Sequence, residues 1–409
     1  MQLPHETFVT DLAIIMILAA IVTLAFFKIR QPLIIGYLFA GMLIGPLSPL
    51  WTSILPQNGS SGTSAGIGIL SDISALNLFA DIGVILLLFV IGIEFPFAKI
   101  RSIGKVAVGS GTLGLFATLG VVFMAASALG LNFMDSLFIA AALSISSTAI
   151  IIKILQDSGK IKKESSILVL GILIVEDVIA VILIASLESV GLVGTVSIET
   201  VALVVLVASG LFIGTFTIGR RVIPPLIDKV ASAQNREILL LSVLGVCFGY
   251  ALLANVVGLS VAIGAFLAGV LVAESKSSEV SKILSSPIKD MFVAIFFVSV
   301  GALMDITQLD SYIFIAIALI AVTIAMKFGG NLLGNMAFRQ EKGKALRSAF
   351  ALSAPRGEFS IVIVKVGVDM GVVSAFLFPL IGLITIITAF ISPFLIRLGD
   401  KIIPKLVKS

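Results

Sequence analysis

The sequence predicts an all-α polytopic membrane protein with about thirteen membrane-spanning helices. Three observations carry this prediction: the composition, a series of apolar runs along the whole chain, and the distribution of basic residues between those runs. Of the 409 residues, 59% are hydrophobic and only 12% are charged. Soluble domains have about 25% charged residues, so this composition is typical of a chain that lies in lipid.

Apolar runs follow one another along the chain, and most have the length of about 20 residues that crosses a bilayer as a helix. The ninth run, GLSVAIGAFLAGVL, is short and rich in glycine, and it is the weakest member of the series. The thirteen expected spans are 8–27, 33–50, 74–96, 105–129, 134–155, 166–188, 198–219, 237–255, 259–274, 288–304, 311–335, 345–368 and 372–397.

The basic residues test this count, because they gather in every second connection between the spans. The opposite connections contain no Lys or Arg and hold acids such as Asp72, Asp135 and Asp305. By the positive-inside rule, the N-terminus is expected outside and the C-terminus in the cytoplasm, which requires an odd number of spans. We see no targeting segment, so the expected location is the inner or plasma membrane of a prokaryotic cell. No basic patch predicts binding to nucleic acid.

Two adjacent acids lie in the middle of the sixth span, in the stretch GILIVEDVIAVILIA at 171–185. A charged residue at this depth costs on the order of 3 kcal/mol and normally faces the protein interior or a water-filled cavity. Glu176 and Asp177 point about 100° apart on a helix, so one partner serves only one of them well. We therefore expect one acid to be paired and the other to be available for a cation or a proton.

The eleventh and twelfth spans hold the basic residues that could balance these acids. Lys327 lies in an apolar helix without an acid nearby in sequence, and an unpaired buried charge is strongly destabilising. We expect it to pair with Glu176 or Asp177. Arg356 and Glu358, in APRGEF, are two residues apart, and we expect them to have a structural role, satisfying each other or a neighbouring helix.

Two spans contain residues that break helices at mid-depth. The fifth reads ALSISSTAIII and includes Ser146, Ser147 and Thr148, whereas the twelfth reads ALSAPRGEFSI and includes Pro355 and Gly357. Proline removes a backbone donor and glycine loosens a helix. Unwound backbone at this depth is tolerated only inside protein or along a cavity.

The two breaks lie seven spans apart, and an odd offset reverses the direction of the second helix across the membrane. This pattern predicts inverted-topology repeats, with the substrate site at the interrupted helices. The expected organisation is a single membrane transport domain over 1–409, with repeat one at about 8–188, a linking helix at about 198–219 and repeat two at about 237–397. No soluble regulatory domain is expected.

The chain resembles the monovalent cation:proton antiporter superfamily, with the Kef-type and NapA-like proteins as the most similar branch. The resemblance is carried by the motifs VEDVIAV, SSTA and PRGEFS and by Lys327. The resemblance covers nearly the whole chain. It implies a core domain with two crossing broken helices, a dimerisation domain, a homodimer and an elevator-like exchange of cation against proton. It also implies that Asp177 is the shared cation and proton site, with Glu176 as its neighbour and Lys327 as the ion-pair partner of Glu176.

The Glu-Asp pair bears on the transported ion. The resemblance associates two carboxylates with Na⁺ exchange and a Gln-Asp pair with Kef-type K⁺ exchange. We therefore expect Na⁺/H⁺ exchange, with K⁺/H⁺ exchange as the alternative and no cofactor besides the transported ions. We expect no counterpart of the nucleotide-binding domain that gates many Kef-type proteins. Regulation is therefore either absent or supplied by a separate subunit.

The expected mechanism is competition, in which deprotonated Asp177 binds a monovalent cation with help from oxygens near Ser146, Ser147 and Thr148, and protonation releases it. A cation channel or uniporter is a less favoured class, because no filter motif like TVGYG is present. An intramembrane enzyme is disfavoured too. The only histidine is His5 and the only cysteine is Cys247, and no nucleophile–base set accompanies the acids.

Overall fold

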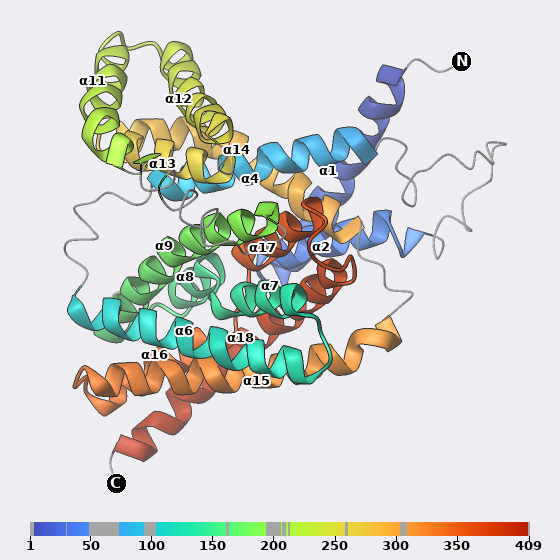
Figure 1. Ribbon diagram of the computed structural model, residues 1–409, viewed down its shortest axis with the longest axis vertical. Coiled ribbons are helices and arrows are strands. Elements are labelled where there is room, and N and C mark those ends of the chain that lie inside the picture. Colours follow the sequence, from blue (N-terminus) through green and yellow to red (C-terminus); the bar gives the residue numbers. More distant parts are fainter. Residues whose placement is uncertain are drawn as a thin grey trace, which may run out of the picture. The chain divides into compact units, whose positions relative to one another are not determined.

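The computed structural model describes residues 4–29, 31–48, 73–93, 104–160, 163–193, 206, 210–211, 213–257, 261–302 and 309–407. Within these ranges the chain forms helices joined by short connections (Figure 1). The helices are α1 (Pro4–Lys28), α2 (Leu33–Ile44), α4 (Ile73–Ile93), α6 (Lys105–Ala128), α7 (Phe133–Ser144), α8 (Thr148–Asp157), α9 (Glu164–Val193), the π-helix η1 (Thr215–Gly219), α11 (Arg220–Ala231), α12 (Arg236–Val256), α13 (Val261–Ala273), α14 (Ser278–Ala302), α15 (Leu309–Ala337), α16 (Lys342–Ser353), α17 (Glu358–Asp369) and α18 (Leu377–Val407).

The described helices match the predicted series of membrane spans. Seven of them are long and apolar enough to cross a bilayer, and further apolar helices are shorter. Each predicted span coincides with one helix or with a broken pair of helices, except the seventh. That span, 198–219, lies mostly outside the described residues. The protein is therefore an all-helical, multi-pass membrane protein.

Both predicted helix breaks are present. The fifth span is divided into α7 and α8 by the non-helical residues 145–147, and the twelfth into α16 and α17 by residues 354–357. The hydroxyl-rich and Pro/Gly-containing sequences therefore end one helix and start another within a single apolar run.

Some predicted boundaries were wrong. Helix α14 begins at Ser278 rather than 288, and α18 continues to Val407 rather than ending at 397. In both cases the extra turns are polar or amphipathic, so a search for apolar runs detects only the lipid-facing part of the helix. Helix α11 was expected to be part of a basic connection, for the same reason.

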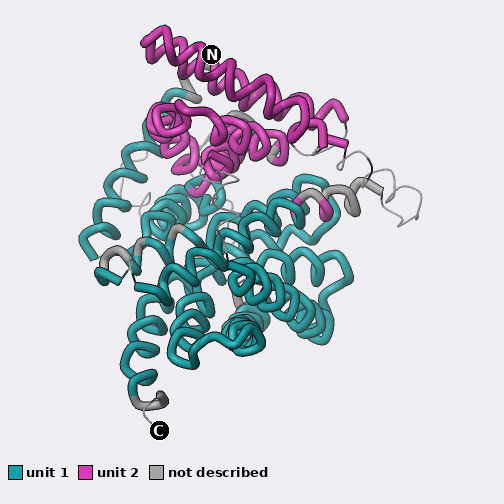
Figure 2. The backbone as a smooth tube through the Cα atoms, turned by 90° about the vertical axis from the view of Figure 1, so that its left-hand side faces the viewer, with its two compact units in different colours: residues 1–73, 103–183, 298–409 teal, residues 74–102, 184–297 magenta. Residues whose placement is uncertain are grey.

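The described helices fall into two compact units, each with its own core (Figure 2). Unit 1 comprises residues 1–73, 103–183 and 298–409, and unit 2 comprises 74–102 and 184–297. In unit 2, α4, α11, α12 and α13 enclose buried apolar side chains such as Phe89, Val243 and Ala268. Unit 1 contains both broken helices and all the candidate site residues named above. The boundaries proposed for the two repeats remain a prediction.

Close contacts between a glycine and the backbone of a crossing helix occur in both units. In unit 1, a Cβ on Gly41 of α2 would lie 2.0 Å from the Val298 carbonyl oxygen, and one on Gly301 would lie 2.1 Å from that of Leu38. In unit 2, the same test places Gly269 of α13 2.0 Å from the Phe89 oxygen. Small residues let helix backbones approach closely in membranes. The first crossing joins α2 to α14, and the second joins α13 to α4. In the predicted inverted repeat α2 corresponds to α13 and α4 corresponds to α14, so the two crossings are equivalent.

Asp135 differs from its expected place in an external connection. It lies in the first turn of α7 and is only 2% exposed. Its carboxylate accepts hydrogen bonds from the backbone N–H of Ser374 at 2.7 Å, from the Ser374 hydroxyl at 2.6 Å and from the Asn132 amide at 2.7 Å. This acid therefore links the start of α7 to the connection between α17 and α18.

We expect Gly41→Ala and Gly269→Ala each to destabilise the protein, because the new methyl group meets backbone that cannot rotate away. Overpacking of this kind costs about 1–3 kcal/mol or more. The measurement is the thermal unfolding midpoint in detergent. The control is Gly120→Ala in α6, where a Cβ meets no atom within 4 Å and helix propensity favours alanine. Equal midpoints for all three variants would contradict the proposed close crossings.

Candidate functional site

The two helix breaks meet inside unit 1. The backbone N–H of Ser147 donates a hydrogen bond to the Pro355 carbonyl at 2.8 Å, and the Ser146 hydroxyl donates to the Leu352 carbonyl at 3.1 Å. A third contact runs from the Ser360 hydroxyl to the Ala142 carbonyl at 2.6 Å. The broken helices are therefore bonded to each other through backbone groups that the breaks leave open.

Gly357 is required for this close contact. A Cβ at this position would lie 2.3 Å from the Ser147 hydroxyl oxygen and 2.5 Å from its Cβ. The glycine in PRGEFS therefore lets the start of α17 pack directly against the first break. Pro355, two residues earlier, has no backbone N–H and therefore needs no acceptor for one.

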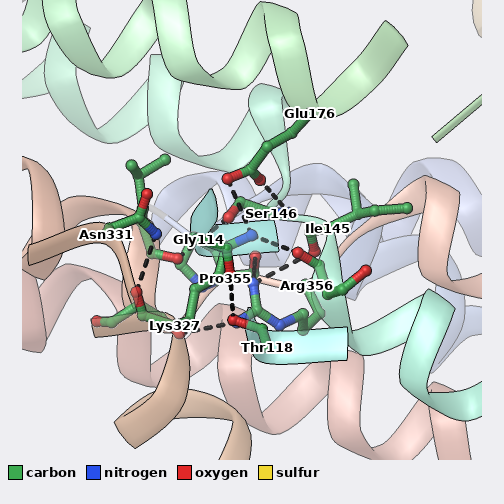
Figure 3. Close-up of polar contacts among 12 residues, drawn as sticks. Gly114, Thr118, Ile145, Ser146, Glu176, Lys327, Asn331, Pro355 and Arg356 are labelled. Carbon is green, nitrogen blue, oxygen red and sulfur yellow. Dashed lines mark hydrogen bonds and ion pairs between the residues drawn. The ribbon is translucent and has the colours of Figure 1, made fainter. Parts of the chain in front are cut away.

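Two buried cations satisfy the carbonyl groups at the ends of α7 and α16. Arg356 is fully buried, and its guanidinium donates to the carbonyls of Ile145 at 3.3 Å and Ser353 at 2.9 Å (Figure 3). The ammonium of Lys327 donates to the Ser144 carbonyl. Helix C-termini carry partial negative charge and unpaired carbonyls, so both cations are placed where the backbone needs them.

Of the two alternatives expected for Arg356 and Glu358, bonding to each other or to a neighbouring helix, the described residues show the second. The guanidinium of Arg356 bonds to backbone carbonyls, whereas a carboxylate oxygen of Glu358 accepts from the Ser147 hydroxyl at 3.3 Å. Both residues therefore bond to the first broken helix from the second. The sequence spacing left both alternatives open, because residues on either side of a helix break do not follow helical geometry.

Glu176 and Lys327 form the central ion pair of the site. The carboxylate oxygen Oε1 lies 2.9 Å from the Lys327 ammonium, and both side chains are 0% exposed. The second oxygen, Oε2, accepts the backbone N–H of Ser146 at 2.9 Å. Of the two adjacent acids, the structure therefore pairs Glu176 with the lysine and attaches it to the first break.

Asp177 has a different set of contacts. Its side chain is 4% exposed, and Oδ2 accepts the hydroxyl of Thr148, the first residue of α8, at 2.8 Å. Of the three predicted hydroxyl ligands, only Thr148 bonds to Asp177 in the structure. The hydroxyls of Ser146 and Ser147 bond instead to Leu352 and Glu358 of the second broken helix. The carboxylate and the hydroxyl together offer oxygen ligands, and the carboxylate is also a proton-accepting group.

Sequence analysis missed a buried polar face on α15. Thr323, Lys327, Asn331 and Asn335 recur every fourth residue and are all 0% exposed. The Asn331 amide donates to the Lys327 carbonyl at 2.9 Å, and the Asn335 amide donates to the Ser348 hydroxyl of α16 at 2.9 Å. Residues four apart share one face of a helix. That spacing, in an otherwise apolar helix, was the signal that could have revealed this face.

This polar face packs against α6. A Cβ on Gly114 would lie 2.9 Å from the side-chain oxygen of Asn331, and one on Gly330 would lie 3.2 Å from the Cα of Gly114. Figure 3 shows Gly114 and Thr118 of α6 beside Lys327 and Asn331. The small residues of α6 and α15 allow this approach, which fixes the helix that carries the lysine.

We expect Lys327→Met to destabilise the protein by about 3–5 kcal/mol, because it leaves the Glu176 charge buried without its partner. The double variant Lys327→Met/Glu176→Met removes both charges and should recover a large part of this loss. The measurement is a double-mutant cycle of unfolding free energies. Additive losses in the double variant would show that the two side chains are not coupled, contrary to the pair seen here.

The chain matches the family model described as "Sodium/hydrogen exchanger, transmembrane" over residues 13–397. Among curated proteins, it is 27% identical to the K⁺/H⁺ antiporter subunit KhtU of Bacillus subtilis over 95% of this chain and 92% of the relative. It is also 27% identical to the high-affinity Na⁺/H⁺ antiporter NhaS3 of Synechocystis over 90% and 84% of the two chains.

A solved structure has the same fold. The sodium proton antiporter MjNhaP1 from Methanocaldococcus jannaschii superposes with a TM-score of 0.71 and covers 98% of each chain at 17% sequence identity. At that identity the match establishes the fold alone, and the family rests on the sequence match over 13–397. This chain belongs to the sodium/hydrogen exchanger family of monovalent cation:proton antiporters.

Proposed function

We propose that this antiporter exchanges one monovalent cation for protons at a single shared site, the carboxylate of Asp177. The observation that carries the proposal is the different placement of two adjacent acids. Glu176 is held by Lys327 and the Ser146 N–H, whereas Asp177 is bonded to a hydroxyl at the start of α8. Glu176 is therefore the carboxylate seen to balance the buried charge of Lys327, and Asp177 is the carboxylate placed beside the hydroxyl of the first break.

The chemistry of Asp177 suits both ions. A deprotonated carboxylate and the Thr148 hydroxyl supply oxygen ligands, which small hard cations prefer. Protonation of the carboxylate removes the negative charge that holds the cation, and the two ions then compete. Removing a cation would otherwise leave a buried negative charge beside an existing ion pair, a state that is costly in low dielectric. The site therefore favours being occupied by a cation or a proton at each step.

Alternating access follows from the fold class rather than from a measured movement. Inverted repeats around interrupted helices place the substrate site near mid-membrane and allow it to face either side in turn. We propose an elevator-like movement on this basis, with the N-terminus outside and the C-terminus in the cytoplasm. Formation of a homodimer also belongs to this proposal, as does control by a separate regulatory chain, which the name of KhtU as a subunit supports.

Na⁺ is the first candidate ion, since the Glu-Asp pair keeps two carboxylates at the site. K⁺ is the second candidate. KhtU is named as a K⁺/H⁺ antiporter subunit and NhaS3 as an Na⁺/H⁺ antiporter. Both names occur at the same sequence identity, so the ions must be compared directly on this protein.

We expect purified protein in liposomes to dissipate an imposed proton gradient when Na⁺ or K⁺ is added, and Asp177→Asn to abolish this response. The amide keeps the size of the side chain but can neither carry the negative charge nor take up the proton. The measurement uses a pH-sensitive dye inside the vesicles, with each cation titrated at several pH values.

The matched control is Asp369→Asn, since Asp369 pairs with Lys365 at the end of α17, away from Asp177 in sequence. It should exchange like the unmodified protein. Full exchange by Asp177→Asn would refute the proposed site. Cation flux that does not respond to the pH gradient would support a channel or uniporter instead.

A further inference from the structure

Two carboxylates from different helices meet the start of α8. Thr148, the first residue of α8, donates its hydroxyl proton to Asp177 of α9 at 2.8 Å. Ser147, the residue before it, donates its hydroxyl proton to Glu358 of α17 at 3.3 Å. Consecutive Cα atoms are about 3.8 Å apart, so adjacent side chains hold the two carboxylates. Glu358 therefore lies near the carboxylate that the proposed function assigns to the transported ion.

The hydroxyl of Ser147 is fixed by its other contacts. Its oxygen accepts the backbone N–H of Ile150 at 3.4 Å, and the Ser147 carbonyl accepts the N–H of Ile151 at 3.2 Å. Ser147 thus caps α8, and its single hydroxyl proton is directed to Glu358. The contact that joins the two breaks therefore also sets the position of the Glu358 carboxylate beside α8.

The surroundings of Glu358 favour its ionised form. It is the first residue of α17 and only 7% exposed, and the N-terminus of a helix favours negative charge. Arg356, two residues earlier, is fully buried, and its guanidinium donates to backbone carbonyls. Those carbonyls carry no formal charge, and a buried cation without a compensating anion is strongly destabilising. An ionised Glu358 supplies that compensating charge.

Other charges near Glu358 are few among the side chains that the structure describes. Lys327 and Glu176 lie at the first break and pair with each other. Helix α17 packs against α7 and α18. The charged residues of these three helices lie toward their ends, away from the breaks: Asp135 on α7, Lys365 and Asp369 on α17, and Arg397, Asp400, Lys401 and Lys405 on α18. The charge of Glu358 therefore acts on Asp177 with little competition from its own helix.

We propose that Glu358 is a second determinant of ion binding, whose negative charge strengthens the binding of both the cation and the proton at Asp177. Glu358 does not itself take up the transported ion. Two unit charges about 10 Å apart, at an effective dielectric constant of about 20, change the binding of a monovalent ion by about tenfold. This role goes beyond the structural one expected for Glu358. It rests on the proposed function, in which Asp177 is the shared site.

An electrostatic role of this kind has a specific pH dependence. Without the charge of Glu358, Asp177 should hold the cation and the proton more weakly by the same factor. At alkaline pH no proton competes, so the cation concentration required for half-saturation should rise. At acidic pH the cation must displace a proton, and the two losses cancel. Disturbed packing alone has no reason to weaken the binding of both ions by one factor.

The test measures the binding of radiolabelled Na⁺ and K⁺ to the full-length protein in detergent at several pH values. Glu358→Gln keeps the size of the side chain but removes its charge. It should require about tenfold more cation at alkaline pH and the same concentration as the unmodified protein at acidic pH. Glu358→Asp keeps the charge and should stay within about threefold of the unmodified protein throughout. The unfolding midpoint of each variant shows that it is folded.

The matched control is Glu341→Gln, since Glu341 is an exposed glutamate before α16 that lies 3.7 Å from Lys344. It should bind both ions as the unmodified protein does. The proposal is overturned if Glu358→Gln binds normally at alkaline pH, if its loss persists at acidic pH, or if Glu358→Asp or the control shows the same loss.

Failure of the proposed function gives a different result. If the unmodified protein binds neither cation, or Asp177→Asn binds as well as the unmodified protein, Asp177 is not the site and the role of Glu358 falls with it. Cation binding that depends on Asp177 but not on the charge of Glu358 refutes only the present inference.

Discussion

The need to satisfy open backbone groups inside a membrane controls the organisation of unit 1. Each helix break leaves carbonyl and N–H groups without helical partners at a depth where water is scarce. Arg356 and Lys327 bind the carbonyls of Ile145, Ser353 and Ser144, and the Glu176 carboxylate binds the N–H of Ser146. Under the proposed function, the charges that stabilise the breaks also lie next to the carboxylate that binds the ion, so the fold and the function would use neighbouring side chains.

This constraint explains why two acids stand side by side. Glu176 has a structural task, since it neutralises Lys327 and binds the first break. Asp177, one residue further along α9, points in a different direction and bonds to Thr148. Under the proposed mechanism, the fixed pair keeps the break intact while the neighbouring carboxylate exchanges its ligand. A transport site that changes charge at every cycle can then operate without unfolding the backbone around it.

Much of the fold could be predicted from the sequence, because hydropathy and the alternation of basic connections report directly on a bilayer. The breaks in ALSISSTA and ALSAPRGE and the pairing of a buried lysine with one of two buried acids follow from the same physics. The choice of Glu176 over Asp177 does not follow from this physics, because it depends on the rotation of α9 about its axis, and only the resemblance to the antiporter superfamily implied it. The partners of Ser146, Ser147 and Arg356 depend on how two irregular segments pack, which no periodicity encodes.

Other structural features have a signal in the sequence that the predictions above did not use. The four-residue spacing of Thr323, Lys327, Asn331 and Asn335 marks a polar helix face. The glycines of α2 and α13 occupy matching places in IGYLFAG and IGAFLAG, which predicts the shared mode of crossing found for Gly41 and Gly269. Asp135 was assigned to a connection because hydropathy places an acid outside, although a cluster of donors makes its burial favourable.

The most direct test of the shared site is proton release on cation binding, measured with purified protein in weakly buffered detergent solution. Adding Na⁺ or K⁺ should release protons in a saturable way, because the cation displaces the proton of Asp177, and acidification should raise the cation concentration required. Thr148→Val should shift the titration to higher cation concentration, and Asp177→Asn should release no protons. Undiminished release from Asp177→Asn, or none from the unmodified protein with either ion, would contradict the account.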